Sequence, residues 1–200
     1  MFVKICGITN VKDALDAIEL GADAVGFLFT ESPRKISVSK ASEIVKQLPA
    51  NFLTIGVFRD QEAREVIDTV GEVGLLGAQM HGRESVAEVA EVIQHVEWVA
   101  KSVIAGSQEA LKADEFGTSL ILVDSANPGT GTSYDLNLLQ QIPKALRLIL
   151  SGGLTVMNVG ESIKVVSPWG VDVSSGVETS PGVKDRTKMR DFIKNARSNL

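Results

Sequence analysis

Two side chains that can move protons each stand at the end of a short apolar segment. Cys6, the only cysteine, follows residues 2–5, and Asp124 follows residues 120–123. A thiol with a near-neutral pKa can take a proton from carbon, and a carboxyl shielded from water can give one to an oxygen. Each also has a simpler interpretation, because a lone cysteine is commonly a small buried hydrophobe and an aspartate before a Pro- and Gly-containing segment is commonly a loop residue.

Two further polar side chains are candidates for binding a ligand. Arg34, in the sequence Ser-Pro-Arg, could pair with a carboxylate through two hydrogen bonds, although most arginines are solvated surface groups. His81 could donate a hydrogen bond to a ligand or simply cap a loop. We expect no metal site, because His81 and His95 are far apart in sequence and no second cysteine is present.

The elements that must position these side chains repeat one unit, a buried strand followed by an amphipathic helix. Apolar runs predict strands at 2–6, 24–29, 52–58, 75–80, 98–103, 120–123, 146–150 and 171–173. Apolar residues at helical spacing predict helices that start near 11, 41, 63 and 86, a weak one at 107–113, a short one from about 135, one at 155–166 and one closing the chain. Gly7, behind Cys6, permits a sharp turn or the close approach of another group.

Eight strand–helix units of about 25 residues favour a (β/α)₈ TIM barrel of nearly minimal size, because closure leaves no open sheet edge. We expect residues 1–200 to form this single domain. An open doubly wound sheet is the alternative, but residues 6–10 do not form the glycine-rich dinucleotide turn expected after its first strand. In a barrel the reactive face lies at the carboxyl ends of the strands, and Cys6, Arg34, His81 and Asp124 all fall there.

Small residues follow the last two predicted strands. Gly152 and Gly153 come after the seventh strand, and Ser174, Ser175 and Gly176 come after the eighth. Either segment alone is ordinary turn chemistry. Because both lie where barrels usually bind phosphate at a helix N-terminus, together they predict a phosphate site.

Composition narrows the classes of partner. The 200 residues are 44% hydrophobic with a formal net charge of -5, which gives no basic surface for nucleic acid or an anionic membrane. A single cysteine excludes an internal disulfide, and no apolar stretch is long enough to span a bilayer. We therefore expect a soluble cytoplasmic protein whose partner is a small molecule.

The motifs taken together resemble one family, phosphoribosylanthranilate isomerase of tryptophan biosynthesis, over essentially the whole chain. They are Lys4-Ile5-Cys6-Gly7-Ile8-Thr9, Gly21-Ala22-Asp23-Ala24-Val25-Gly26-Phe27, Ser32-Pro33-Arg34, Gln79-Met80-His81-Gly82, Gly129-Thr130-Gly131, Leu150-Ser151-Gly152-Gly153-Leu154 and Gly170-Val171-Asp172-Val173-Ser174-Ser175-Gly176-Val177-Glu178. The first and last motifs are the most specific.

The resemblance implies a cofactor-free Amadori rearrangement of N-(5-phosphoribosyl)anthranilate to 1-(2-carboxyphenylamino)-1-deoxyribulose 5-phosphate. It makes Asp124 the general acid at the furanose ring oxygen and Cys6 the general base at sugar C2. Arg34 would hold the anthranilate carboxylate, and His81 and Asp172 would bind and orient the substrate. The two serine–glycine loops would hold the phosphate. The resemblance allows either a monomer or a homodimer.

The chain departs from the family pattern at three places. Met80 replaces the usual leucine, the loop at 127–131 lacks an added glycine before it, and the segment at 155–158 lacks the usual proline. Met for Leu conserves volume, and a changed loop can alter turnover.

Two rival functions remain at the level of sequence. A histidine-pathway phosphosugar isomerase would carry aspartates at the ends of strands one and five, where this chain has Cys6 and then Lys101 and Ser102. A barrel that binds phosphate without catalysis would need neither Cys6 nor Asp124.

Overall fold

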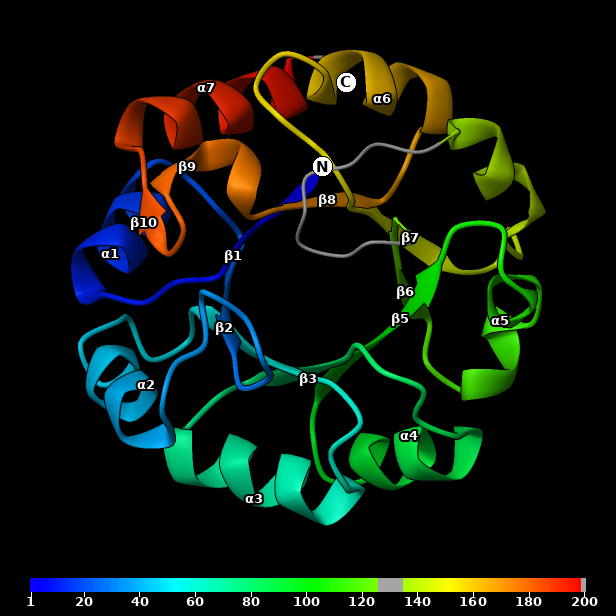
Figure 1. The fold of residues 1–200 in the computed structure, drawn as a ribbon, viewed down its shortest axis with the longest axis horizontal. Helices are drawn as coiled ribbons and strands as arrows, with labels where there is room; N and C mark the ends of the chain where they lie inside the picture. Colours follow the sequence, from blue (N-terminus) through cyan, green and yellow to red (C-terminus); the bar gives the residue numbers. More distant parts are fainter. Residues whose placement is uncertain (126–134, 199–200) are drawn as a thin grey trace.

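The computed structural model describes residues 1–125 and 135–198, and within them eight parallel strands close into a barrel (Figure 1). β1 pairs with β8, so the sheet has no open edge, and the predicted TIM-barrel fold is confirmed. The glycine motif at 129–131 and the loop departure at 127–131 lie outside the described residues. The strands are β1 (Phe2–Cys6), β2 (Ala24–Leu28), β3 (Leu53–Phe58), β4 (Gly77–Met80), β5 (Trp98–Ile104), β6 (Leu120–Asp124), β7 (Arg147–Leu150) and β8 (Gly170–Val173).

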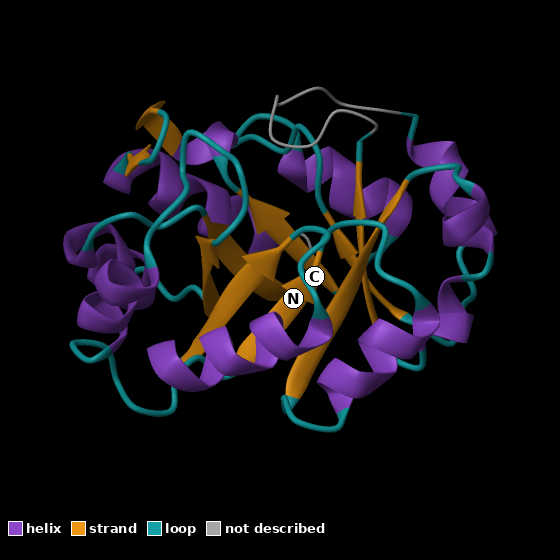
Figure 2. Ribbon diagram, turned by 60° about the horizontal axis from the view of Figure 1, so that its bottom comes forward, coloured by secondary structure: helices purple, strands orange, loops and turns teal. Residues whose placement is uncertain are grey.

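Helices surround the barrel and cover the outer face of the sheet (Figures 1 and 2). Their starts are set by local sequence: Asn10 caps the first helix, and Ser85 forms a capping box with Glu88 at the fourth. The helices are α1 (Val11–Glu19), α2 (Val38–Val45), α3 (Ala63–Val73), α4 (Val86–Ile93), α5 (Gln108–Leu111), α6 (Val159–Val166) and α7 (Arg186–Arg197), with 3-10 turns η1 (Ala113–Phe116), η2 (Leu136–Gln141) and η3 (Ser175–Val177). No helix among the described residues is long and apolar enough to cross a membrane.

Strand side chains alternate between two cores. Outward residues such as Val25 and Phe27 pack against the helices, while inward residues fill the barrel. At the amino-terminal end of the interior, the Phe2 ring stacks on Trp169 and Trp98, with centroid distances of 4.7 and 6.2 Å. This end of the barrel is therefore filled, and a ligand pocket has to open at the other end.

The loop after β8 contains elements that periodicity did not predict. Residues 175–177 form η3, and a small hairpin of β9 (Glu178–Ser180) and β10 (Val183–Lys184) follows before α7. Strands of three and two residues are too short to produce an alternating pattern.

One predicted helix begins later than expected. α6 starts at Val159 rather than near Thr155, because Asn158 accepts a hydrogen bond from the Thr155 N–H and donates one to the Gly153 carbonyl. These bonds hold the segment as a turn.

Candidate active site

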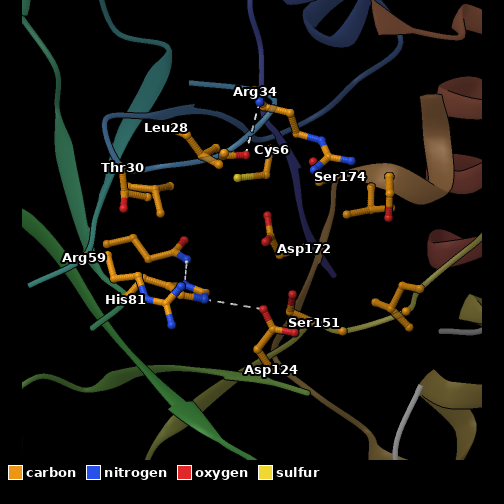
Figure 3. A pocket seen from close by; sticks show the side chains of 18 of the residues that line it. Cys6, Leu28, Thr30, Arg34, Arg59, His81, Asp124, Ser151, Asp172 and Ser174 are labelled. Atoms are coloured by element: carbon orange, nitrogen blue, oxygen red, sulfur yellow. Dashed lines mark hydrogen bonds and ion pairs between the residues drawn. The ribbon is translucent and has the colours of Figure 1, made fainter. Parts of the chain in front are cut away.

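A pocket of about 800 Å³, including its part open to solvent, lies at the carboxyl-terminal end of the barrel (Figure 3). Its walls come from all the strands except β5, through inward residues and the loops that follow them. The lining residues are Cys6, Leu28, Thr30, Glu31, Ser32, Arg34, Val57, Arg59, Gln79, His81, Asp124, Ser151, Gly152, Gly153, Leu154, Asp172, Val173, Ser174 and Ser175. Candidate residues that are far apart in the sequence, such as Cys6 and Asp172, therefore share one cavity.

Cys6 faces the pocket from the end of β1 and is 6% exposed. Gly26 leaves room for it, since a Cβ there would lie 2.8 Å from the Cys6 sulfur. Gly7 has a φ of +77°, and a Cβ on it would lie 2.6 Å from the Arg34 side chain, so the predicted close approach is present. Burial raises the pKa of the Cys6 thiol, and the nearby Lys4 ammonium opposes that shift only in part.

Below Cys6 lies a charged layer inside the barrel. Lys4 is fully buried and donates to Asp172 Oδ1 and to Gln79 Oε1, both at 2.9 Å. Burial disfavours the Lys4 ammonium, but the charge of Asp172 and its hydrogen bond are the main influences that oppose burial, and the pKa of Lys4 is raised. Lys4 therefore remains a cation beneath the pocket.

Asp124 and His81 face each other on the opposite wall (Figure 3). His81 Nε2 lies 3.5 Å from Asp124 Oδ2, and Gln79 Nε2 lies 2.8 Å from His81 Nδ1. Asp124 is 6% exposed, and its Oδ1 accepts a hydrogen bond from the Ser125 N–H. The carboxyl thus stands in a nearly closed environment of hydrogen-bond donors.

Arg34 is buried and bound within the protein. Its Nε and Nη2 donate to the two oxygens of Glu178 at 2.8 and 2.7 Å, and Lys184 adds a third bond to Glu178 at 2.8 Å. Burial opposes ionisation of Glu178, but these hydrogen bonds outweigh it and lower its pKa. Arg34 still lines the pocket, and its fork to Glu178 does not use Nη1.

The two serine–glycine loops lie side by side at one end of the pocket. Gly152 and Gly153 have φ values of +84° and +72°, a backbone that other residues rarely adopt. Ser174 and Ser175 line the same cavity, while Gly176 is not among the lining residues and packs against the Leu154 backbone. The helical turn nearest to these loops is η3, which begins at Ser175. The helix after the first loop, α6, begins only six residues after Gly153.

Some residues in this arrangement had no role in the sequence analysis. Four of them lie within or near the quoted motifs but had no predicted function: Lys4, Gln79, Glu178 and Lys184. Arg59 lies outside those motifs and had no predicted function either. A signal for the first two was available, because alternate residues of a strand share one face. Lys4 is two residues before Cys6 on β1, and Gln79 on β4 is two residues before His81, which directly follows that strand. Among the described residues no cluster of three or more His, Cys, Asp or Glu side chains is arranged to hold a metal ion.

Comparisons with known proteins agree over the whole length of the chain. Residues 3–195 match the family model described as N-(5'phosphoribosyl)anthranilate (PRA) isomerase. The N-(5'-phosphoribosyl)anthranilate isomerase of Bacillus cereus is 41% identical over 199 residues, which cover 96% of each chain.

Solved structures give the same result. The phosphoribosyl anthranilate isomerase of Thermus thermophilus superposes with a TM-score of 0.93 at 34% identity, covering 100% of both chains. A second solved structure is a phosphoribosyl anthranilate isomerase in complex with reduced 1-(o-carboxyphenylamino)-1-deoxyribulose 5-phosphate. It superposes with a TM-score of 0.86 at 37% identity, covering 99% of both chains. The chain belongs to the N-(5'-phosphoribosyl)anthranilate isomerase family of tryptophan-pathway enzymes.

Proposed function

We propose that this pocket converts N-(5'-phosphoribosyl)anthranilate to 1-(2-carboxyphenylamino)-1-deoxyribulose 5-phosphate by acid–base catalysis. The observation that carries the proposal is the placement of one thiol and one shielded carboxyl in a single pocket whose end wall is made of small residues. The compound bound in the related complex carries a phosphate and a carboxylate, which fits a pocket lined by Arg34 and Arg59.

Asp124 acts first, as the general acid. It gives its proton to the furanose ring oxygen, the C1–O bond breaks, and the nitrogen lone pair forms a protonated imine. The Ser125 N–H donates a hydrogen bond to Asp124 Oδ1, and His81 Nε2 faces Asp124 Oδ2. These two contacts fix the orientation of the carboxyl.

Cys6 acts second, as the general base. The protonated imine makes the C2 hydrogen acidic, so the thiolate takes that proton and the electrons form an enolamine, which tautomerises to the ketone. A metal ion has no required role in this step, because the imine itself accepts the electron pair. Lys4 supplies a positive charge that favours the thiolate.

The remaining side chains hold the substrate. Gly152, Gly153, Ser174 and Ser175 offer N–H groups and hydroxyls to the phosphate, with Gly176 shaping the second loop from behind. Arg34 turns its Nη1 side toward the anthranilate carboxylate, and Glu178 keeps the guanidinium in place.

Asp172 and His81 orient the sugar from opposite sides. The bond from Lys4 takes Asp172 Oδ1, which leaves the rest of the carboxylate for sugar hydroxyls. We propose the cytoplasm as the location of the reaction, because a lone thiol stays reduced there. The assembly is either a monomer or a homodimer, and light scattering distinguishes them.

The test is single-turnover conversion of freshly generated substrate by the wild type, Cys6→Ser and Asp124→Asn. We expect each variant to lose about 10²- to 10⁴-fold in rate, the usual contribution of a general acid or base. Binding of the reduced product analogue should be retained in both, which separates catalysis from folding. A wild type that binds the analogue without turnover would instead be a phosphate-binding barrel.

A further inference from the structure

We propose that Gln79 is a positioning residue that holds His81 in the tautomer with its proton on Nε2, so that this N–H always faces Asp124. The consequence is that Asp124 keeps its own proton for the substrate. This inference rests on the proposed role of Asp124 as the general acid. Gln79 and His81 are neither the proposed acid nor the proposed base, and they lie next to the groups that react.

The first step is the orientation of the Gln79 amide. Lys4 Nζ lies 2.9 Å from Gln79 Oε1, and an ammonium group can only donate. The oxygen of the amide must therefore face Lys4, and its NH₂ group faces the other way. Lys4 is fully buried and Gln79 is 1% exposed, so water does not compete for this bond.

The second step is the tautomer of His81. Gln79 Nε2 lies 2.8 Å from His81 Nδ1, and an amide nitrogen only donates. His81 Nδ1 must then carry the lone pair, which leaves the proton of the neutral ring on Nε2, 3.5 Å from Asp124 Oδ2. An Nδ1–H would place two donors against each other at this distance.

The third step concerns the proton of Asp124. Oδ1 accepts from the Ser125 N–H at 2.7 Å, and Oδ2 faces the His81 N–H. If His81 carried its proton on Nδ1 instead, the bare Nε2 would accept the acid proton of Asp124 and withdraw it from the substrate. Gln79 excludes that arrangement, so His81 cannot accept the proton that Asp124 gives to the substrate.

The charged groups near His81 do not by themselves fix the tautomer. Arg59 and Asp124 line the pocket with it, and the Lys4–Asp172 pair lies beyond Gln79. An ionised Asp124 favours Nε2–H, but a protonated Asp124 is satisfied by either ring form. Gln79 is thus needed in the protonation state that starts catalysis.

The tautomer can be read directly by ¹⁵N NMR of the imidazole rings at about pH 8, where an ordinary histidine is neutral. The chain has two histidines, so His95→Gln assigns the remaining signal to His81. We expect Nε2–H in the wild type and a proton on Nδ1 in Gln79→Glu, because the new carboxylate accepts a hydrogen bond from Nδ1–H. Gln79→Met, which keeps the length without the amide, serves as the uncharged variant and is measured in an Asp124→Asn background, where no ionised carboxylate favours Nε2–H. It should give a mixture of the two ring forms.

A double-mutant cycle connects the tautomer to the rate. Gln79→Glu should lower kcat about tenfold or more with little change in KM, a loss within the range of proton-transfer catalysis. In a His81→Asn background the same substitution should cost less than about threefold, because an amide side chain has no tautomers to switch. Analogue binding in all four proteins verifies that the site is folded.

Three results would overturn the inference. A wild-type His81 with its proton on Nδ1 contradicts it whatever the activity. A Gln79→Met spectrum in the Asp124→Asn background that is identical to that of Asp124→Asn alone also contradicts it. An equal cost of Gln79→Glu in both backgrounds assigns Gln79 a purely structural role. If the tautomer switches as expected but the wild type does not turn over, the proposed function fails while the tautomer assignment stands.

Discussion

The thiol of Cys6 experiences two opposing influences at one position. Burial keeps its proton on, and the Lys4 ammonium beneath it favours the thiolate. Burial is the larger effect, so in the ligand-free protein the pKa of Cys6 is raised above its ordinary value of 9.0. The base is therefore mostly protonated at neutral pH, and only a minor fraction of the protein is ready to react.

This predicts the pH dependence of thiolate formation at Cys6, the only cysteine. Because burial raises the pKa of the thiol, its thiolate fraction should rise with pH from about 7 to about 9, approaching tenfold per unit while the thiol remains mostly protonated. The measurement is the ultraviolet absorbance of the thiolate across this range in a constant ionic background. Cys6→Ser is the control and should lack this rise, whereas a wild-type thiolate signal that is already complete at about pH 7 would exclude a raised pKa.

At the scale of elements, a buried ion cluster joins two loops on the pocket rim. Arg34 follows β2, while Glu178 and Lys184 belong to the β9–β10 hairpin after β8. Glu178 is 8% exposed and binds both cations. The hairpin thus aligns Arg34 at the pocket even though it contributes no lining residue.

Glu178→Gln should lower the free energy of unfolding by about 3 kcal/mol, because it leaves two buried cations without their counterion. The same substitution should also weaken binding of the reduced product analogue, because Arg34 loses its hydrogen bonds to Glu178. Urea unfolding and analogue titration measure the two effects. Asp68→Asn is the control, since it breaks an exposed Arg64–Asp68 pair worth less than about 1 kcal/mol.

The same cluster predicts the direction in which the stability of the protein changes with pH. Folding lowers the pKa of Glu178 from 4.5, so its contribution is present above that value and is lost as the pH falls through the lowered pKa. The difference between the wild type and Glu178→Gln should therefore shrink below about pH 4. An unchanged difference in acid would contradict the assignment of this charge.

At the scale of the whole molecule, the barrel separates stability from chemistry. The rings of Phe2, Trp98 and Trp169 fill the amino-terminal end, and the pocket opens at the carboxyl-terminal end. Phe2 packs against an inner core that includes Leu122 and Ile149. Changes at the closed end should therefore affect folding without reaching the reacting groups.

Phe2→Ala should lower the free energy of unfolding by about 2 kcal/mol, below the usual cost for a fully buried aromatic because Phe2 is only partly buried. The rate of the folded variant should be unchanged.

Urea unfolding followed by tryptophan fluorescence and by circular dichroism should give coincident transitions if residues 1–200 are one domain. Separated transitions would contradict a single domain. For the Phe2→Ala prediction, Leu15→Ala at a 43% exposed position is the control, with a smaller expected loss of stability.

The sequence by itself determined the order of elements and the face on which chemistry occurs. Apolar strands such as residues 24–28 are buried on both sides, and helices such as α1 bury one side, and these local patterns require a layer of helices around a parallel sheet. Strand ends then bring Cys6, His81 and Asp124 to one rim. The short hairpin after β8 and the late start of α6 escaped prediction because each depends on a few individual hydrogen bonds.

Only the tertiary structure decided which polar side chains bind one another. Lys4 pairs with Asp172 across 168 positions of sequence, and Arg34 pairs with Glu178 across 144. Alternation on a strand predicts that Lys4 points inward, but its partner is set by the register of β1 on β8, in which Lys4 lies opposite Asp172. Barrel closure fixes that register, and closure is a property of all eight strands together, so no local segment of sequence contains it.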